Sequence, residues 1–404
     1  MDDTFFVDGE WKFVFRNWRV TLHEKKERNV DRILTAGLIA LIFCAAESHA
    51  QVVQANVWPF DVPTDPRTVA MGESFVALPG EPTALMSNPA GLVGLQGIGL
   101  SYAQRSLNWL KGLEDFKYHS WNAYLGVPFG VFAMQYNRYT MGEVDVSTTS
   151  SPQGVGRERI YEHSFAVGFG TELAENFSAG VAAKLFDVVH SVVNWTGPTA
   201  FDFSTTPAFL LDLGAQYTVP VFLGDSSMQT GVTWGVSLQN FGTNFKTKYS
   251  LTENEATAQL PRYLRIGVAF HIRLLPRTAG ALQLASLAVT AEYRNLLNGS
   301  DYPDSEREHW GFGAECTMFE IFSVRVGGVI RPYSSIYGEK GRLMARSGVG
   351  LRVPLAKLGV AAPLAVSCGY ALIPINRYPN GFMTGNVDNL STFSVGLEYT
   401  ETPW

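Results

Sequence analysis

The residues of this sequence best suited to chemistry are ionisable side chains that interrupt apolar, alternating segments. They are Lys184, Asp212, Arg265, His271, Glu292, Glu315, Arg325, Arg352 and Glu398. They stand in phase with Gly, Ala and Ser, on the opposite side of a period-two pattern from the large apolar residues. Two roles are open for them: they line a polar path, or they form ion pairs that close an interior or hold an inserted segment. The mixture of acids and bases, without a constriction of one sign, favours the second role.

Catalytic, metal-binding and nucleotide-binding patterns are not legible in the sequence. The seven histidines are scattered, and none pairs with another at the spacing of metal ligands. No G-x-S-x-G, H-E-x-x-H, phosphate-loop or EF-hand pattern occurs. We therefore expect a protein that is not an enzyme and holds no cofactor or metal, and we interpret His271 as a polar wall residue.

The composition favours β-structure. Of the 404 residues, 39 are Gly and 13% are aromatic, while only 17% are charged, below the roughly 25% of soluble globular domains. This combination indicates many tight turns and a surface that need not be fully hydrated. The net charge of -6 comes without a basic stripe interleaved with aromatics, so nucleic acid is not an expected partner.

The first fifty residues contain the pattern of a secretory signal peptide. A basic cluster precedes the apolar run 33–46, and the small residues Ser48 and Ala50 follow it. We expect cleavage before Gln51, so that residues 1–50 form a cleaved N-terminal extension and signal peptide. The apolar run is too short to cross about 30 Å of hydrocarbon as a helix. No later stretch is long enough either, so a mature membrane protein would have to be a barrel.

Period-two alternation then recurs as far as residue 400, with large apolar residues on one face. In "SFAVGFG", Phe165, Val167 and Phe169 share a face, and Ser, Ala and Gly share the other. A soluble sandwich, the alternative fold, would show a mostly charged second face. An outward apolar band around a lumen of small and polar residues fits better. Aromatics near strand ends could form interfacial girdles or could simply be good strand formers: Tyr118, Trp121, Tyr139, Tyr293, Trp310, Tyr370 and Tyr399.

Fourteen such segments follow, and long polar connections alternate with short turns. The segments begin near residues 97, 117, 129, 159, 175, 207, 228, 261, 283, 307, 320, 342, 359 and 390. This alternation predicts an all-β, transmembrane, antiparallel up-and-down barrel over residues 97–404. We expect long loops at 141–158, 188–206 and 242–259, among others, and a short turn at 354–357. The barrel would lie in the outer membrane of a diderm bacterium, with both termini periplasmic and with outer-membrane lipid and the barrel-assembly machinery as partners.

The stretch "AMGESFVALPGEPTALMSNPAGLVGL", residues 70–95, precedes the first strand and fits neither helix nor strand. Its small residues, Gly72 among them, would let the backbone pack closely against a wall. Pro82 suits the first position of a helix. Asn88 before Pro89 is disfavoured in a helix, and Gly91 permits a turn into the first strand.

This stretch resembles the N-terminal signature of FadL-like outer-membrane β-barrels, and of their PorV/PorQ branch in particular. The matching positions are Met71, Gly72, Phe75, Pro82, Asn88, Pro89 and Gly91. The resemblance implies a 14-stranded barrel whose N-terminal segment, here residues 51–96, folds into the lumen as a plug.

The resemblance also implies two functions. FadL-like barrels move small hydrophobic or amphipathic compounds across the outer membrane, and this is the function we expect. PorV-like members instead serve type IX secretion by receiving exported cargo proteins, which is the alternative. The barrel is common to both, so the fold does not choose between them.

Overall fold

A computed structural model describes residues 63–106, 116–148, 151–193, 203–221, 227–249, 255–275, 282–298, 308–330, 343–374 and 390–400. The predicted signal peptide and residues 51–62 of the predicted plug lie outside the described residues.

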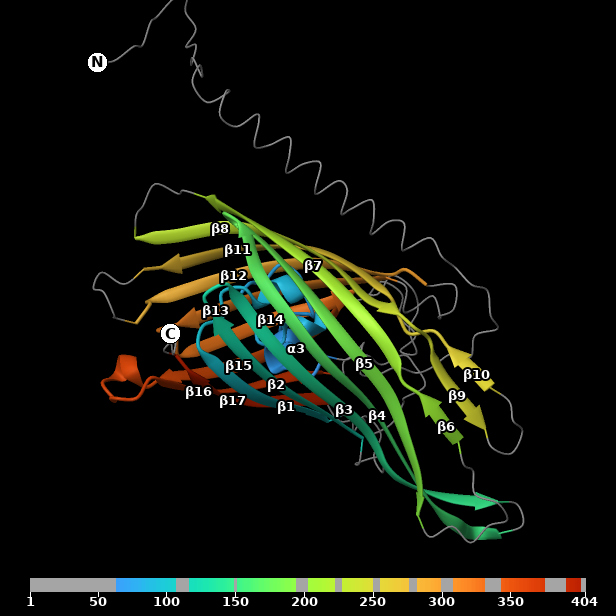
Figure 1. The fold of residues 1–404 in the computed structure, drawn as a ribbon. Coiled ribbons are helices and arrows are strands. Elements are labelled where there is room, and N and C mark those ends of the chain that lie inside the picture. The colour runs from blue at the N-terminus through green and yellow to red at the C-terminus, as the bar shows by residue number, and fades with distance from the viewer. Residues whose placement is uncertain are drawn as a thin grey trace, which may run out of the picture. The chain divides into compact units, whose positions relative to one another are not determined.

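Fourteen antiparallel strands close into a barrel (Figure 1). They are β1 (Ile98–Ser106), β2 (Lys117–Val127), β3 (Gly130–Thr148), β4 (Ser151–Ala174), β5 (Phe177–Val193), β7 (Ala208–Val221), β8 (Met228–Gly242), β11 (Tyr263–Leu274), β12 (Ala285–Leu296), β13 (Glu308–Met318), β14 (Phe322–Ile330), β15 (Leu343–Pro354), β16 (Leu364–Ile373) and β17 (Leu390–Tyr399). Each barrel strand pairs with the barrel strands before and after it in the sequence, and β1 closes the ring against β17, with Ile98 opposite Tyr399. The predicted up-and-down barrel is confirmed.

The barrel has two distinct ends. At one end, called the short-turn end, Ile98 and Tyr399 meet, and tight turns at Glu175–Asn176 and at 319–321 join neighbouring strands. The opposite end, called the long-loop end, carries Ser106 and Lys117 and the longer connections.

The two faces of the wall differ as the alternation predicts. Large apolar side chains point outward and are exposed, among them Leu100 (58%), Phe132 (46%) and Val349 (54%). An exposed apolar band of this kind suits lipid rather than water. Of the candidate girdle aromatics, Trp121, Trp310, Tyr370 and Tyr399 are exposed, whereas Tyr118 and Tyr139 are buried. The girdle interpretation is therefore wrong for those two tyrosines, which fall on the inward phase of β2 and β3.

Two regions predicted as loops contain strands. In 141–158, β3 and β4 continue, and Glu143 pairs with Arg159 across them. The ion pairs of this extension join Arg157 and Arg159 to acidic side chains on the facing strand. Polar residues occupy much of both strands, so the extension gives no apolar signal in the sequence.

The second region is a small separate sheet formed from residues of the predicted loops 188–206 and 242–259. Its strands, in the order β10-β9-β6, are β6 (Phe203–Thr206), β9 (Phe245–Tyr249) and β10 (Glu255–Ala258). Phe245 packs against the inward-facing Phe186 and Leu210 of the barrel, together with Ala258 and Leu260. The sheet therefore covers inward-facing side chains of β5 and β7 near the long-loop end.

One predicted turn is longer than expected. The chain between β15 and β16 contains a short 3-10 helix, η4 (Ala356–Leu358), and β16 begins at Leu364 rather than near residue 359.

Candidate functional site in the barrel interior

The chain before β1 runs lengthwise through the inside of the barrel, and we call residues 63–97 the inner segment. At its start, the Arg105 guanidinium donates to the Pro63 carbonyl oxygen at 2.8 Å, close to the long-loop end of β1. At its finish, the Gly97 carbonyl accepts from the Gly126 amide at 2.8 Å, near the short-turn end. Figure 1 shows its helix, α3, enclosed by the strands. The position of the N-terminus itself lies outside the described residues.

The inner segment contains three short helical turns: α3 (Pro66–Ala70), η1 (Ala84–Met86) and η2 (Pro89–Leu92). Asp65 caps α3 by accepting from the Thr68 amide at 3.0 Å, and Pro66 occupies a first-turn position that needs no amide donor. Pro82 does not open a helix as predicted, because η1 begins two residues later after Thr83. Pro89 fills that role instead, in η2. No helix among the described residues is both long and apolar enough to cross a membrane.

The backbone of the inner segment packs directly against glycines of the barrel wall. A Cβ atom on Gly235 would lie 2.2 Å from the Val76 carbonyl oxygen, and one on Gly180 would lie 2.3 Å from the Pro89 carbonyl carbon. Gly311 and Gly327 meet the backbone of the segment in the same way, at 2.3 Å and 2.5 Å. Distances this short exclude any side chain. The small-residue face of the strands therefore fits a backbone that lies directly against it.

Gly72 of the inner segment also has no room for a side chain where it meets the wall. Its φ of 65° is disfavoured for other residues, and a Cβ atom there would lie 2.4 Å from the carbonyl oxygens of Phe312 and Gly328. The neighbouring motif residues Met71 and Phe75 are buried, at 0% and 2% exposure.

Asn88 ties the segment to itself and to the wall. Its side-chain amide donates to the Val76 carbonyl at 2.7 Å and to the Ala215 carbonyl at 3.1 Å, while its oxygen accepts from the Ala90 amide at 3.0 Å. The wall residue Gln216 also donates to the Val76 carbonyl, at 3.0 Å. Asn88 is fully buried, so these bonds satisfy polar groups that water does not reach.

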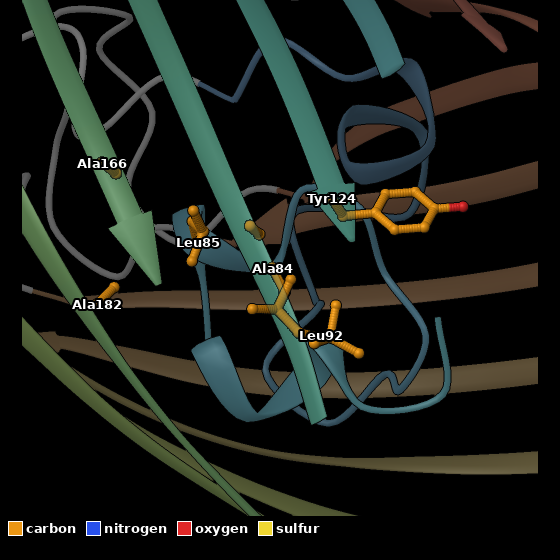
Figure 2. Packing of buried hydrophobic residues seen from close by; sticks show 8 residues of the cluster. Ala84, Leu85, Leu92, Tyr124, Ala166 and Ala182 are labelled. Atoms are coloured by element: carbon orange, nitrogen blue, oxygen red, sulfur yellow. The ribbon is translucent and has the colours of Figure 1, made fainter. Parts of the chain in front are cut away.

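An apolar cluster holds the second half of the segment. Ala84, Leu85 and Leu92 pack against wall residues that include Ala166 and Ala182 (Figure 2). Gly91 lies beside this cluster, where a Cβ atom would be 2.9 Å from the Leu78 carbonyl oxygen.

Ion pairs hold the first half of the segment. Arg67 donates to both oxygens of Glu315 on β13, with 2.6 Å for the shortest contact, and it also pairs with Glu81 within the segment. Arg325 on β14 donates to Glu315 at 2.6 Å. One buried carboxylate thus lies between two guanidinium groups, one from the wall and one from the segment.

We predict that Glu315→Leu lowers the stability of the folded barrel by about 3–5 kcal/mol, because it leaves Arg325 buried without its carboxylate. The measurement is the temperature at which the folded band disappears on a detergent gel. Glu398→Gln is the matched control, since its partner Arg352 is 38% exposed, and it should change stability by less than about 1 kcal/mol. The double variant Glu315→Leu/Arg325→Met should recover part of the loss. Equal effects of Glu315→Leu and Glu398→Gln would contradict this account.

A second carboxylate, Glu292, binds the backbone of the segment. Its Oε2 accepts from the Phe75 and Val76 amides at 2.7 and 2.8 Å, while Arg265 donates to Oε1 at 2.9 Å. Arg265 continues along the wall by donating to Gln239 at 2.6 Å.

A buried ion pair on β5 and β7 lies beyond Gln239 on the same inward face of the wall. Lys184 lies 2.5 Å from Asp212, and the Asn240 amide donates to Asp212 at 2.8 Å. Of the two roles proposed for the inward ionisable residues, the contacts of Lys184, Asp212, Arg265, Glu292, Glu315 and Arg325 therefore match ion pairing rather than an open polar path.

A third cluster was missed by the sequence reasoning. Glu73 of the segment contacts Arg346 at 2.7 Å and His309 at 3.3 Å, and Arg294 donates to His309 Nδ1 at 3.0 Å. The wall members were detectable, because Arg294 is in phase with Glu292 and Arg346 is in phase with Arg352. Glu73 lies outside any alternating segment, so periodicity gives no signal for it.

Three of the predicted inward residues do not join these clusters. Arg352 and Glu398 pair with each other at 2.7 Å near the short-turn end. His271 lies on β11, several strands away around the barrel; it stands opposite Gly231, also toward the short-turn end, and is partly buried. Pro82 is only partly buried and contributes no polar contact of its own.

The polar clusters described above hold the inner segment against the barrel wall. Their carboxylates are occupied by guanidinium, ammonium or amide donors, which are the partners of a structural network. Among the described residues, no group of three His, Cys, Asp or Glu side chains is placed to hold a metal ion. What the arrangement can do is hold a peptide segment inside the barrel.

Comparisons with known proteins leave the family open. No family model matches the sequence. No curated protein matches it either. Among solved structures, the chain is similar to the Ralstonia pickettii toluene transporter TbuX, with 10% identity, 86% of this chain and 100% of that one covered, and a TM-score of 0.42. It is similar to the Pseudomonas putida toluene transporter TodX with 9% identity and a TM-score of 0.48, over 84% of this chain and 99% of that one. It is similar to a Pseudomonas aeruginosa FadL homologue with 11% identity and a TM-score of 0.43, over 85% of this chain and 99% of that one. These similarities are too slight to assign a family or a function.

Proposed function

We propose that this protein is an outer-membrane channel for small hydrophobic or amphipathic compounds, and that the inner segment is the plug that controls passage. The observation that carries the proposal is the seating of residues 70–90 on wall glycines, with the segment running from the long-loop end to the short-turn end. A compound crossing the barrel would have to displace part of this segment.

The exposed apolar band supports a membrane location, and the sequence resemblance of residues 70–92 supports a FadL-like outer-membrane barrel. In this proposal the long loops face outward, and the short-turn end, with the C-terminal strand, faces the periplasm. The assignment to the PorV/PorQ branch, and with it the reception of secreted cargo proteins, remains a prediction of the resemblance alone.

Deleting residues 52–92 tests the plug. We expect the barrel to fold, because Glu315 keeps Arg325 and Glu292 keeps Arg265 as a partner within the wall. The shortened protein should conduct ions across planar bilayers where the full chain does not. Cells carrying it should take up a radiolabelled monoaromatic hydrocarbon or fatty acid faster than cells carrying the full chain.

Three outcomes would argue against the proposal. If the shortened chain forms no heat-modifiable barrel, the segment is a folding element. If it folds but conducts no better than the full chain, the segment is not a plug. If the full chain neither binds nor passes any hydrophobic probe but co-purifies with secreted proteins, cargo reception becomes the better reading.

A further inference from the structure

The outer face of β2, β3 and β4 carries a row of polar side chains at one height. Cross-strand pairing places His119 opposite Arg138, and Arg138 opposite His163. Arg138 stacks over the Tyr161 ring at 4.3 Å. Lys117, two residues before His119, lies on the same outward phase. Among the described residues no carboxylate forms an ion pair with Arg138 or Lys117, and the one acid in the row, Asp187 on β5, stands opposite His163. This part of the lipid-facing wall therefore carries a net positive charge.

A row of aromatic side chains lies directly below the polar row, toward the short-turn end. Tyr102, Trp121, Tyr136 and Phe165 are cross-strand neighbours in that order. The tyrosine hydroxyls reach back to the polar row: Tyr102 hydrogen-bonds His119 at 2.8 Å, and Tyr136 hydrogen-bonds His163 at 3.0 Å. Each imidazole is thereby fixed beside the guanidinium.

Below the aromatic row the wall is hollowed. In the next row, Ala123 lies between Leu100 and Met134. Its side chain is much shorter than theirs, which leaves a depression between them. The hollow has a volume of about 490 Å³, and its walls include Trp121, Phe165 and Leu397. It opens on the outer surface of the barrel, since Leu100 and Met134 are 58% and 48% exposed.

The height of the polar row matches a lipid headgroup. From Arg138 to Gly130, at about 3.3 Å per residue and a tilt of about 40°, β3 descends roughly 20 Å. The apolar band of such barrels is about 25 Å tall, so Arg138 lies at one edge of it. Tyr and Trp are enriched at that level, and a basic residue there costs little.

We propose that this surface binds one anionic glycerophospholipid, with an acyl chain in the hollow over Ala123 and the phosphate on Arg138 between the two histidines. Guanidinium groups bind phosphate oxygens through paired N–H donors. This hollow and this row have room for one acyl chain and one phosphate, whereas a glycolipid with several phosphates and many chains would need a wider surface. The site lies on the outer wall and is independent of the inner segment.

Native mass spectrometry of the full-length protein in detergent, titrated with phosphatidylglycerol, tests the proposal. We expect one lipid to be held more tightly than the rest. Arg138→Gln should weaken its binding about tenfold through the lost charge-assisted hydrogen bonds. Ala123→Leu should weaken it comparably by filling the hollow while leaving the charge unchanged.

Two matched variants serve as controls. Arg262→Gln removes another arginine that stacks on a ring, that of Phe241, on a different part of the wall. Ala291→Leu adds the same volume at another outward alanine, on β12. Neither should change phosphatidylglycerol binding, and heat-modifiable migration confirms that each variant is folded.

Two results would overturn the proposal. Equal losses in the controls would mean that the bound lipid is not held at this surface. A purified phosphorylated glycolipid that binds more tightly than phosphatidylglycerol, and loses affinity on Arg138→Gln, would show that the surface takes that lipid instead.

Discussion

A disulfide between positions 66 and 369 should abolish the uptake of hydrophobic compounds, and a reductant should restore it. Gly369 faces inward on β16, and a Cβ atom there would lie 3.4 Å from the Cβ of Pro66, the first residue of α3. Disulfides join Cβ atoms about 3.5–4.5 Å apart, so Pro66→Cys and Gly369→Cys need only a small adjustment. The bond would fix the start of the inner segment to the wall. A segment that must move for passage would then keep the barrel closed.

The experiment needs a background without the native thiols. Of the three cysteines, Cys44 belongs to the predicted signal peptide. Cys316 and Cys368 are free and exposed, and Cys368 adjoins the engineered position, so both are changed to Ser. Uptake of a radiolabelled fatty acid by cells is measured before and after dithiothreitol, with each single-cysteine variant as a control. Undiminished uptake by the fully oxidised protein would show that passage does not require the start of the segment to leave the wall.

The double variant Gly180→Val/Gly235→Val should displace the middle of the inner segment from the wall, while the ring of fourteen strands stays paired. Valine is favoured in strands, so pairing in the wall should not suffer. Each new side chain, however, would overlap backbone of the segment, at Pro89 and at Val76. Overlaps of this kind cost roughly 1–3 kcal/mol each and should add at separate sites. Exposure of the segment should therefore rise by at least about thirtyfold.

Labelling of a single reporter cysteine measures that exposure. Ser87 of the segment is 5% exposed, so Ser87→Cys should react slowly with a membrane-impermeant maleimide and much faster in the double variant. Gly231→Val is the matched control, because it lies on β8 like Gly235 but faces the His271 ring rather than the segment. If Gly231→Val accelerates labelling as much as the double variant does, the close packing of the segment against Gly180 and Gly235 is not what retains it.

The alternation of side chains was sufficient to predict the wall. Phe165 and Val167 point outward and Ala166 points inward. On their own strands, Lys184, Glu292 and Glu315 alternate with outward apolar residues in the same way and point to the interior. This works because one register error would turn a whole strand inside out, so the pattern must be kept along each strand.

The contents of the barrel were less predictable. The motif around Asn88 marks a segment of unusual composition, but its lengthwise path depends on contacts such as that between Thr64 and Thr392, which are 328 positions apart. The sheet around Phe245 escaped prediction because its strands are four or five residues long. Short strands with mixed side chains carry too little periodicity to be seen.

The lengthwise course of the inner segment has a consequence for biogenesis. The seam between β1 and β17 joins the two ends of the barrel chain, so the ring cannot close until the last strand has been made. A ring that closed first would have to admit the segment end-on, past glycines that leave no clearance. Closure around a segment already in place avoids that passage. We therefore expect the ring to close around residues 63–97 when they are present, rather than the segment to enter a finished barrel; closure itself does not require the segment, as the deletion of residues 52–92 tests.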